Sequence, residues 1–208
     1  IRFSKKNGVD LIGFTHPDYF SNYDLRHQPE YYLKTTKTVL VIGIYLYDII
    51  LDTWSKDQNS GRSFHYLDSV LESRCHLIKD FLIKKEFKSA IIPYQPGLFL
   101  KEAAALAGIG PIGKNNLLLS HEFGPQVRIR GMVTDAPLEV GIPCRNSSYC
   151  DACSKCVDAC PVNALEDGKY NKEKCLKYNL DNLKNLSEFS KIWCNKCIEA
   201  CPVGRQKK

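Results

Sequence analysis

The sequence predicts an α/β fold in which a body with a mixed sheet covered by helices precedes a small cysteine-rich module. Segments with strand character alternate with helical segments up to about residue 140. Nine of the ten cysteines lie at or after residue 144. Between the two regions, the stretch "TDAPLEVGIPCRNSS" has the proline, glycine and serine content of a connection. We therefore divide the chain into a body, residues 1–140, and a cysteine-rich module, residues 141–208.

The elements of the body follow from the spacing of its apolar residues. In chain order we expect a helix at 1–7, strands at 11–14 and 38–47, a helix at 65–85, a strand at 90–94, a helix at 100–107 and a strand at 126–134. In the last strand Val127 and Ile129 alternate with Arg128 and Arg130. This alternation favours a solvated arginine face, with contact to an anionic cofactor group as the alternative.

The module contains the stretch "CDACSKCVDACP", with the spacing C-x2-C-x2-C-x3-C-P. This is the run of bacterial ferredoxins, in which the fourth cysteine ligates the other cluster. A second run, C-x2-C-x3-C-P, begins at Cys194 and lacks one member, which Cys175 can supply. We therefore expect a ferredoxin-like module with two 4Fe-4S clusters, one held by Cys150, Cys153, Cys156 and Cys201 and the other by Cys160, Cys175, Cys194 and Cys197.

Disulfides and structural zinc are the two alternative uses of these cysteines. Disulfides suit secreted proteins, and the sequence shows no secretory features. Structural zinc usually takes two C-x2-C pairs, which would leave the triple run and both prolines unexplained. Of the two remaining cysteines, Cys75 is in phase with Leu71 and Ile78 on the expected helix and should lie in the core. Cys144 lies in a loop, and we assign it no role.

Composition limits the classes of protein and partner. No apolar run reaches the length of a membrane span, and the longest, residues 38–51, contains Asp48 and fits a buried strand. No signal peptide is recognisable, so we expect a cytoplasmic protein without a membrane partner. The formal charge is +6, and two loaded clusters at roughly −2 each would reduce it to about +2. This excess is too small to indicate nucleic-acid binding, so we expect no tRNA partner.

The stretch "KEAAALAGIGPIGKNNLLLS" contains Gly108, Gly110 and Gly113 and matches two nucleotide-binding patterns, G-x-G-x-x-G and G-x4-G-K. Both patterns should follow a strand and open a helix, whereas here an expected helix precedes the glycines and Pro111 interrupts them. A phosphate loop also needs Ser or Thr where Asn115 stands. The glycines therefore indicate only a close backbone approach, either to a ligand or to another strand.

Taken together, the glycine loop and the cysteine spacing resemble the epoxyqueuosine reductase family. These are cobalamin-dependent iron–sulfur enzymes whose core is related to that of reductive dehalogenases. The stretch "AGIGPIGKNNLLL" is similar to the family's glycine segment, and the isolated Cys175 followed by Tyr178 also fits the family. Weaker similarities lie in "GVDLIGFT" at 8–15 and in "GRSFHYLDSVLESRC" at 61–75.

The resemblance implies that the clusters pass single electrons to a corrinoid (cobalamin), fed by a low-potential electron donor. The corrinoid would lie between the loop 108–114 and the helix start 61–65, with a small-molecule or corrinoid-protein substrate. The implied cofactor-binding residues are Arg62, His65, Gly108, Gly110, Gly113 and Lys114.

The resemblance also places the family's aspartate proton donor at Tyr94, in "IPYQPGLF". A tyrosine can give a proton, so we expect Tyr94 to be the catalytic donor, helped by a cation such as Lys101 or Lys114. The chain departs from the family here, at Pro111 in place of a tryptophan, and in stopping before a C-terminal helical-repeat domain. Three functions therefore stay open: a corrinoid-using reductase, a non-enzymatic two-cluster electron carrier or activator of a corrinoid protein, and a tRNA epoxyqueuosine reductase.

Overall fold

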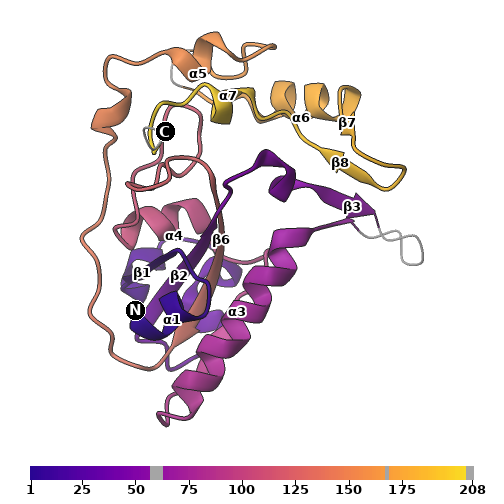
Figure 1. The fold of residues 1–208 in the computed structure, drawn as a ribbon. Coiled ribbons are helices and arrows are strands. Elements are labelled where there is room, and N and C mark those ends of the chain that lie inside the picture. The colour runs from indigo at the N-terminus through magenta and orange to yellow at the C-terminus, as the bar shows by residue number, and fades with distance from the viewer. Residues whose placement is uncertain (57–62, 167–168, 205–208) are drawn as a thin grey trace.

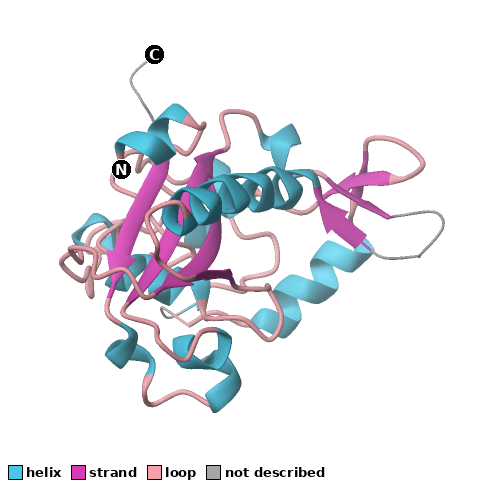
Figure 2. Cartoon of the chain, turned by 90° about the horizontal axis from the view of Figure 1, so that it is seen from below, coloured by secondary structure: helices cyan, strands magenta, loops and turns pink. Residues whose placement is uncertain are grey.

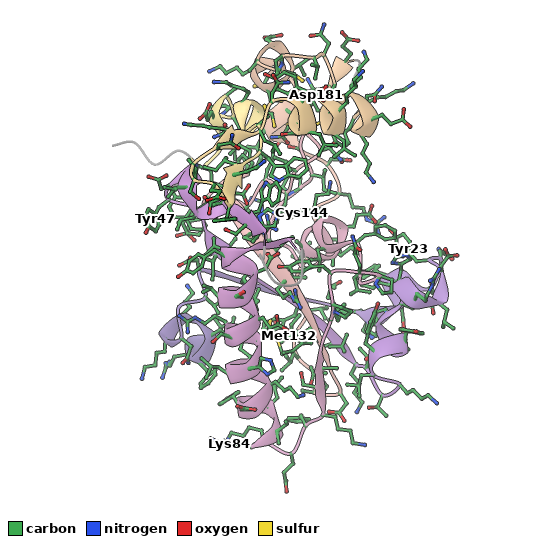
Figure 3. The ribbon with its side chains drawn as sticks, turned by 90° about the vertical axis from the view of Figure 1, so that its right-hand side faces the viewer. Tyr23, Tyr47, Lys84, Met132, Cys144 and Asp181 are labelled. Carbon is green, nitrogen blue, oxygen red and sulfur yellow. The ribbon has the colours of Figure 1, made fainter. Side chains whose placement is uncertain are left out.

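The structure, a computed structural model, describes residues 1–56, 63–166 and 169–204. The body lies at one end, and the segments that carry the clustered cysteines lie at the other (Figure 1). Lys84, just after the long helix of the body, and Asp181, in the module, mark opposite ends of the molecule (Figure 3). Cys144 lies between these ends, on the connection that leads from the body to the module.

The body is built on a four-stranded sheet in the order β1-β2-β6-β5. Its strands are β1 (Leu11–Thr15), β2 (Thr38–Tyr45), β6 (Val127–Thr134) and β5 (Ser89–Ile91). The predicted α/β body is thus confirmed, but every pairing in this sheet is antiparallel. Strands β2 and β5 run in the same direction, but they do not pair with each other, because β6 lies between them. The mixed strand directions expected from the sequence are therefore not formed in the described sheet.

Helix α3 (Tyr66–Ile83) covers one face of this sheet (Figure 2). Side chains alternate along a strand, so Leu40 and Ile42 of β2 point to this face and pack with the apolar stripe of the helix. Cys75 belongs to that stripe and is 0% exposed. The prediction that Cys75 is a core residue is therefore confirmed.

Helix α4 (Leu100–Leu106) covers the opposite face. Here Val39 and Val41 of β2 pack with Ala103, whose small side chain lets the helix approach the sheet closely. The first six residues of β2 are buried because both faces of the strand are covered. The two helices thus cover both faces of the sheet, and the loop after α4 lies at the module end of the body (Figure 1).

A second four-stranded sheet, which the sequence did not predict, joins the body to the module. Its order is β4-β3-β8-β7, with β4 (Ser63–His65), β3 (Trp54–Lys56), β8 (Ser190–Ile192) and β7 (Lys184–Asn185). The central pairing joins β3 to β8, so residues more than 130 positions apart become neighbours. The module is thereby fixed against the start of α3 (Figure 1).

Short helices complete the chain. Residues 16–32, where we expected neither helix nor strand, form two 3-10 turns, Pro17–Phe20 and Leu25–His27, and helix α2 (Pro29–Tyr32). The others are α1 (Arg2–Lys6), the 3-10 turns Ile49–Asp52 and Ser148–Cys150, α5 (Lys155–Asp158), α6 (Lys172–Asp181) and α7 (Lys196–Glu199). Over the described ranges, no helix combines the length and the apolar character needed to cross a membrane.

Candidate functional site

Eight of the nine cysteines of the module gather in two groups of four. Three members of the first run and the last cysteine of the second run line one small enclosed cavity: Cys150, Cys153, Cys156 and Cys201. The other four line a separate cavity of about 410 Å³: Cys160, Cys175, Cys194 and Cys197. Helices α5 and α7 pack together and each carries the chain from one cavity to the other. Pro161 and Pro202 each follow the last cysteine of a run, which lines the other cavity from the rest of its run.

Burial and crowding disfavour the charged form of two of these thiols, Cys156 and Cys197. Burial, followed by the charges of Cys150 and Cys201, raises the pKa of Cys156. Burial, followed by the charge of Cys194, raises the pKa of Cys197 to about 12. Iron ions would reverse this penalty, because metal ligation requires and stabilises thiolates. Cys156 also contributes to the shift at Cys197, so the two groups are neighbours.

Hydrogen bonds fix the second group of cysteines. The side-chain amide of Asn179, on α6, donates from Nδ2 to the carbonyl oxygen of Cys175 at 2.8 Å and lies 3.5 Å from its Sγ. Its Oδ1 accepts from the backbone N–H of Cys194 at 2.6 Å. The backbone N–H of Ala164 donates to Sγ of Cys160 at 3.2 Å. One buried asparagine therefore ties two cysteines of this group together.

The geometry of the thiols differs from that of a single-ion site. Within residues 1–56, 63–166 and 169–204, no three His, Cys, Asp or Glu side chains converge closely enough to hold one metal ion. A four-iron cube is larger than a single ion, so its four thiolates stand further apart. The arrangement of four thiols around each cavity therefore fits a 4Fe-4S cluster better than structural zinc.

The glycine loop contacts its own protein rather than an open ligand site. A Cβ atom at Gly110 would overlap the carbonyl oxygen of Leu119, and one at Gly113 would lie 2.6 Å from Leu119 Cδ1. Gly108 has φ +76, and a Cβ there would lie 2.9 Å from Ile142 O. Backbone approach to another segment, one of the two alternatives from the sequence, is therefore observed at these glycines. The expectation that the same loop borders a corrinoid stays a prediction.

Lys114 also lies away from the larger cavity. Its Nζ donates to the carbonyl oxygen of Cys153 at 3.1 Å, and its side chain lines the smaller cavity. Residues 115–117, immediately after the loop, reach the wall of the larger cavity. Arg62, the other cation expected in a cofactor site, lies outside the described residues.

The body contributes a charged wall to the larger cavity, formed by Asp52, His65 and Arg128. Arg128 donates to Asp52 at 2.9 Å and to Asp68 at 2.8 Å. Burial, followed by the charge of Arg128, lowers the pKa of His65, and its buried Nδ1 has no hydrogen-bond partner in the described structure. Charged groups in low dielectric next to an unpaired donor or acceptor are typical of ligand sites.

Tyr94 lies behind this wall and is not among the described lining residues of the cavity. Its hydroxyl donates to Asp68 at 2.8 Å, and the guanidinium of Arg130 stacks 4.1 Å from its ring centroid. Burial, and then the Asp68 carboxylate, raise the pKa of Tyr94 to about 12. The two cations expected to help, Lys101 and Lys114, donate in the described structure to the carbonyl oxygens of Asn116 and Cys153. The phenol of Tyr94 holds its proton more tightly than usual.

The solvated arginine face expected on β6 is also wrong. Arg130 is 6% exposed and Arg128 is paired with two carboxylates. Both arginines are enclosed because α3 and the turn Ile49–Asp52 lie over this part of the sheet. Their carboxylate partners are far away in sequence, and alternation alone carries no signal for them.

Comparisons with known proteins agree with the cysteine chemistry. The model of the 4Fe-4S binding domain matches residues 143–166. Epoxyqueuosine reductase of Lactococcus garvieae is 31% identical over 185 residues, covering 84% of this chain and 50% of the relative. Epoxyqueuosine reductase of Bacillus subtilis is 26% identical over 212 residues, covering 86% of this chain and 54% of the relative. The chain thus spans about half the length of these curated relatives.

Solved structures show the same fold. An epoxyqueuosine reductase with an epoxyqueuosine-modified tRNA-Tyr stem loop superposes with a TM-score of 0.75 at 23% identity, covering 100% of this chain and 64% of that one. A B12-dependent reductive dehalogenase gives 0.68 at 18% identity, covering 99% of this chain and 31% of that one. The first of these structures holds a tRNA stem loop. The chain is therefore related in sequence to epoxyqueuosine reductases, shares their fold and carries a 4Fe-4S binding domain, as the resemblance predicted.

Proposed function

We propose that the chain is an iron–sulfur oxidoreductase that passes single electrons through two 4Fe-4S clusters to a corrinoid, at which a substrate is reduced. The observation that carries this proposal is the division of eight cysteines into two neighbouring cavities with four cysteines each. In this arrangement Cys150, Cys153, Cys156 and Cys201 hold the first cluster, and Cys160, Cys175, Cys194 and Cys197 hold the second.

The two sides of the larger cavity indicate the direction in which electrons would leave the second cluster. It is lined by all four cysteines of the second group on one side and by the charged wall of the body on the other. An electron that leaves the second cluster therefore emerges toward Asp52, His65 and Arg128 rather than toward bulk solvent. The first cluster, in its enclosed cavity, would receive electrons from the low-potential donor and relay them.

The corrinoid is proposed from the resemblance and from this cavity. A bound corrinoid supplies a low-valent cobalt that performs the difficult reduction. About 410 Å³ is within the roughly 300–1,000 Å³ of small-molecule pockets, so a ring as large as a corrinoid would be enclosed only in part. His65 and Arg128, which line the cavity, would contact its polar edge, and the wall would exclude water from the face turned to the cluster.

The proposed proton donor is Tyr94, which would act through its contact with Asp68. A proton given up by Tyr94 would pass to the Asp68 carboxylate, which Arg128 of the cavity wall holds in place by donating to it. The raised pKa of Tyr94 means that this donor acts only if the reacting atom becomes strongly basic.

The cluster assignment is tested by exchanging single ligands. The parent, purified without oxygen, should contain about eight irons per chain. Cys201→Ala should lose the first cluster, bound by the distant Cys150 group, whereas Cys197→Ala should lose the second. Electron paramagnetic resonance of the reduced proteins separates the two signals. If Cys201→Ala and Cys197→Ala lose the same signal, the crossed assignment is wrong.

The corrinoid is tested by retention. Anaerobic protein is mixed with cobalamin and passed through a desalting column, and the corrinoid spectrum should elute with the protein. Clean separation would contradict the corrinoid site and favour the two-cluster electron carrier.

A second candidate, reduction of epoxyqueuosine in tRNA, is favoured by the names of the relatives and by the stem loop in one matching structure. It predicts a salt-dependent gel shift with a tRNA stem loop. No shift at low salt would exclude this candidate.

A further inference from the structure

Asn115 is a buried polar residue that neither nucleotide-binding pattern nor the cysteine motif explains. It is 4% exposed and lines both cysteine cavities. Its Oδ1 accepts from the backbone N–H of Leu117 at 3.2 Å, which fixes the orientation of the amide. A Cβ at Gly113 would lie 3.0 Å from this Oδ1, so the glycine leaves the space that the side chain of Asn115 occupies. The loop is therefore built around this side chain.

The other end of the amide has no partner. Nδ2 of Asn115 is buried from solvent and donates to no atom of the described structure. Unpaired buried donors are few in native proteins, and each one points to an acceptor that is not part of the polypeptide or to a specific role. An acceptor for Nδ2 would therefore be a group that is not part of the polypeptide.

The smaller cavity provides the place for that group. An atom that faced the larger cavity, which has room for water, would be reached by solvent, and Nδ2 is not. In the smaller cavity the amide lies with Lys114 and the four cysteines of the first group. None of these described side chains accepts from Nδ2, so the available acceptor is a sulfide of the cluster itself.

We propose that Asn115 donates a hydrogen bond from Nδ2 to an inorganic sulfide of the first 4Fe-4S cluster and thereby raises its reduction potential. An electron added to the cluster increases the negative charge on its sulfurs, so a donor stabilises the reduced state more than the oxidised state. The ammonium group of Lys114 acts in the same direction from the same cavity. This inference rests on the proposed two-cluster function.

The second cysteine group uses a similar device. Asn179 is also buried, and its Nδ2 lies 3.5 Å from Sγ of Cys175. A buried asparagine thus lies beside each cysteine group: Asn179 next to a thiol of the second and, in our proposal, Asn115 directed toward the first. With donors at both clusters, the protein can set the two potentials independently and so set the direction of electron flow.

The test is an anaerobic redox titration of the reconstituted full chain, followed by electron paramagnetic resonance. Asn115→Leu keeps the size of the side chain and removes the donor. We expect the equilibrium constant for reduction of the first cluster to fall about tenfold, equivalent to about 59 mV for one electron, with the second cluster unchanged. Asn179→Leu should instead shift the second cluster and leave the first unchanged.

A matched control separates loss of the donor from loosening of the loop. Lys101 donates from Nζ to the carbonyl oxygen of Asn116 at 2.6 Å and so anchors the same loop without touching the first cysteine group. Lys101→Met should leave the first potential unchanged. An equal shift in Lys101→Met, or no shift in Asn115→Leu, would overturn the inference.

Iron content distinguishes this inference from the function on which it rests. A parent with fewer than about eight irons contradicts the two-cluster proposal itself. A parent with both clusters and an unshifted Asn115→Leu contradicts only the role of Asn115. If Asn115→Leu does not assemble the first cluster, the same titration is carried out on Asn115→Ser. The serine side chain is smaller and too short to reach the sulfide, so the potential of the first cluster should again fall.

Discussion

Replacing Tyr94 by phenylalanine removes one hydroxyl from a buried charge network and should destabilise the protein measurably. The hydroxyl donates to Asp68 at 2.8 Å, and a hydrogen bond to a charged group contributes about 1.5–3 kcal/mol. Asp68 keeps two bonds from Arg128, at 2.8 and 3.2 Å, so no charge is left unpaired. We therefore expect a loss near the lower limit, about 1.5 kcal/mol in the free energy of unfolding.

The measurement is urea unfolding followed by circular dichroism. With a slope of about 2 kcal/mol per molar urea, the midpoint of Tyr94→Phe should fall by about 0.7 M. Tyr32→Phe is the matched control, because that hydroxyl donates to a neutral, exposed backbone oxygen, Arg26 O, at 2.7 Å. It should lose about 0.5 kcal/mol or less. Equal losses in both variants would refute the reasoning that the charged, buried partner sets the magnitude.

The same variant tests the proposed donor role and its pH dependence. If Tyr94 is the proton donor, Tyr94→Phe should show a large fall in turnover while its iron content and corrinoid retention stay unchanged. Full activity in this variant would show that Tyr94 has only a structural role. Its pKa rises to about 12 in the fold, against an ordinary value near 10. The folded state therefore holds this proton more tightly, and its stabilising effect is complete below pH 10 and lost as pH rises toward 12. Tyr94→Phe should lose less stability than the parent across that window.

Two further substitutions test the packing of the body. Gly110→Ala should lower the free energy of unfolding by about 3 kcal/mol or more, because the new methyl group meets the backbone carbonyl of Leu119. In Gly131→Ala the tightest contact of the new methyl group is with the movable tip of Leu100, at 2.9 Å, so the loss should be about 1 kcal/mol or less. Similar unfolding midpoints in the two variants would contradict this difference. Cys75→Ala should leave the iron content unchanged and cost about 1 kcal/mol, since Cys75 is a buried core residue, and a fall in iron would show that it is a ligand.

The sequence by itself determined the features that are encoded locally. Apolar periodicity gave the positions of β1, β2, α3, α4 and β6 to within a few residues, because a buried face imposes its repeat on the segment that carries it. Cysteine spacing gave the 4Fe-4S chemistry, because a cube needs several thiolates within a short stretch. Strand β5 was placed less well, since it is only three residues long.

The tertiary structure decided what depends on partners that are distant in the chain. The insertion of β6 between β2 and β5, and the pairing of β3 with β8, join segments whose local sequence carries no mark of each other. That the glycines of the loop after α4 lie closely against Leu119 and Ile142 is visible only in the folded chain. Arg130 looked like a surface residue because alternation specifies two faces of a strand but not what covers each face. Burial is a property of the assembled fold, and so is the unpaired amide of Asn115.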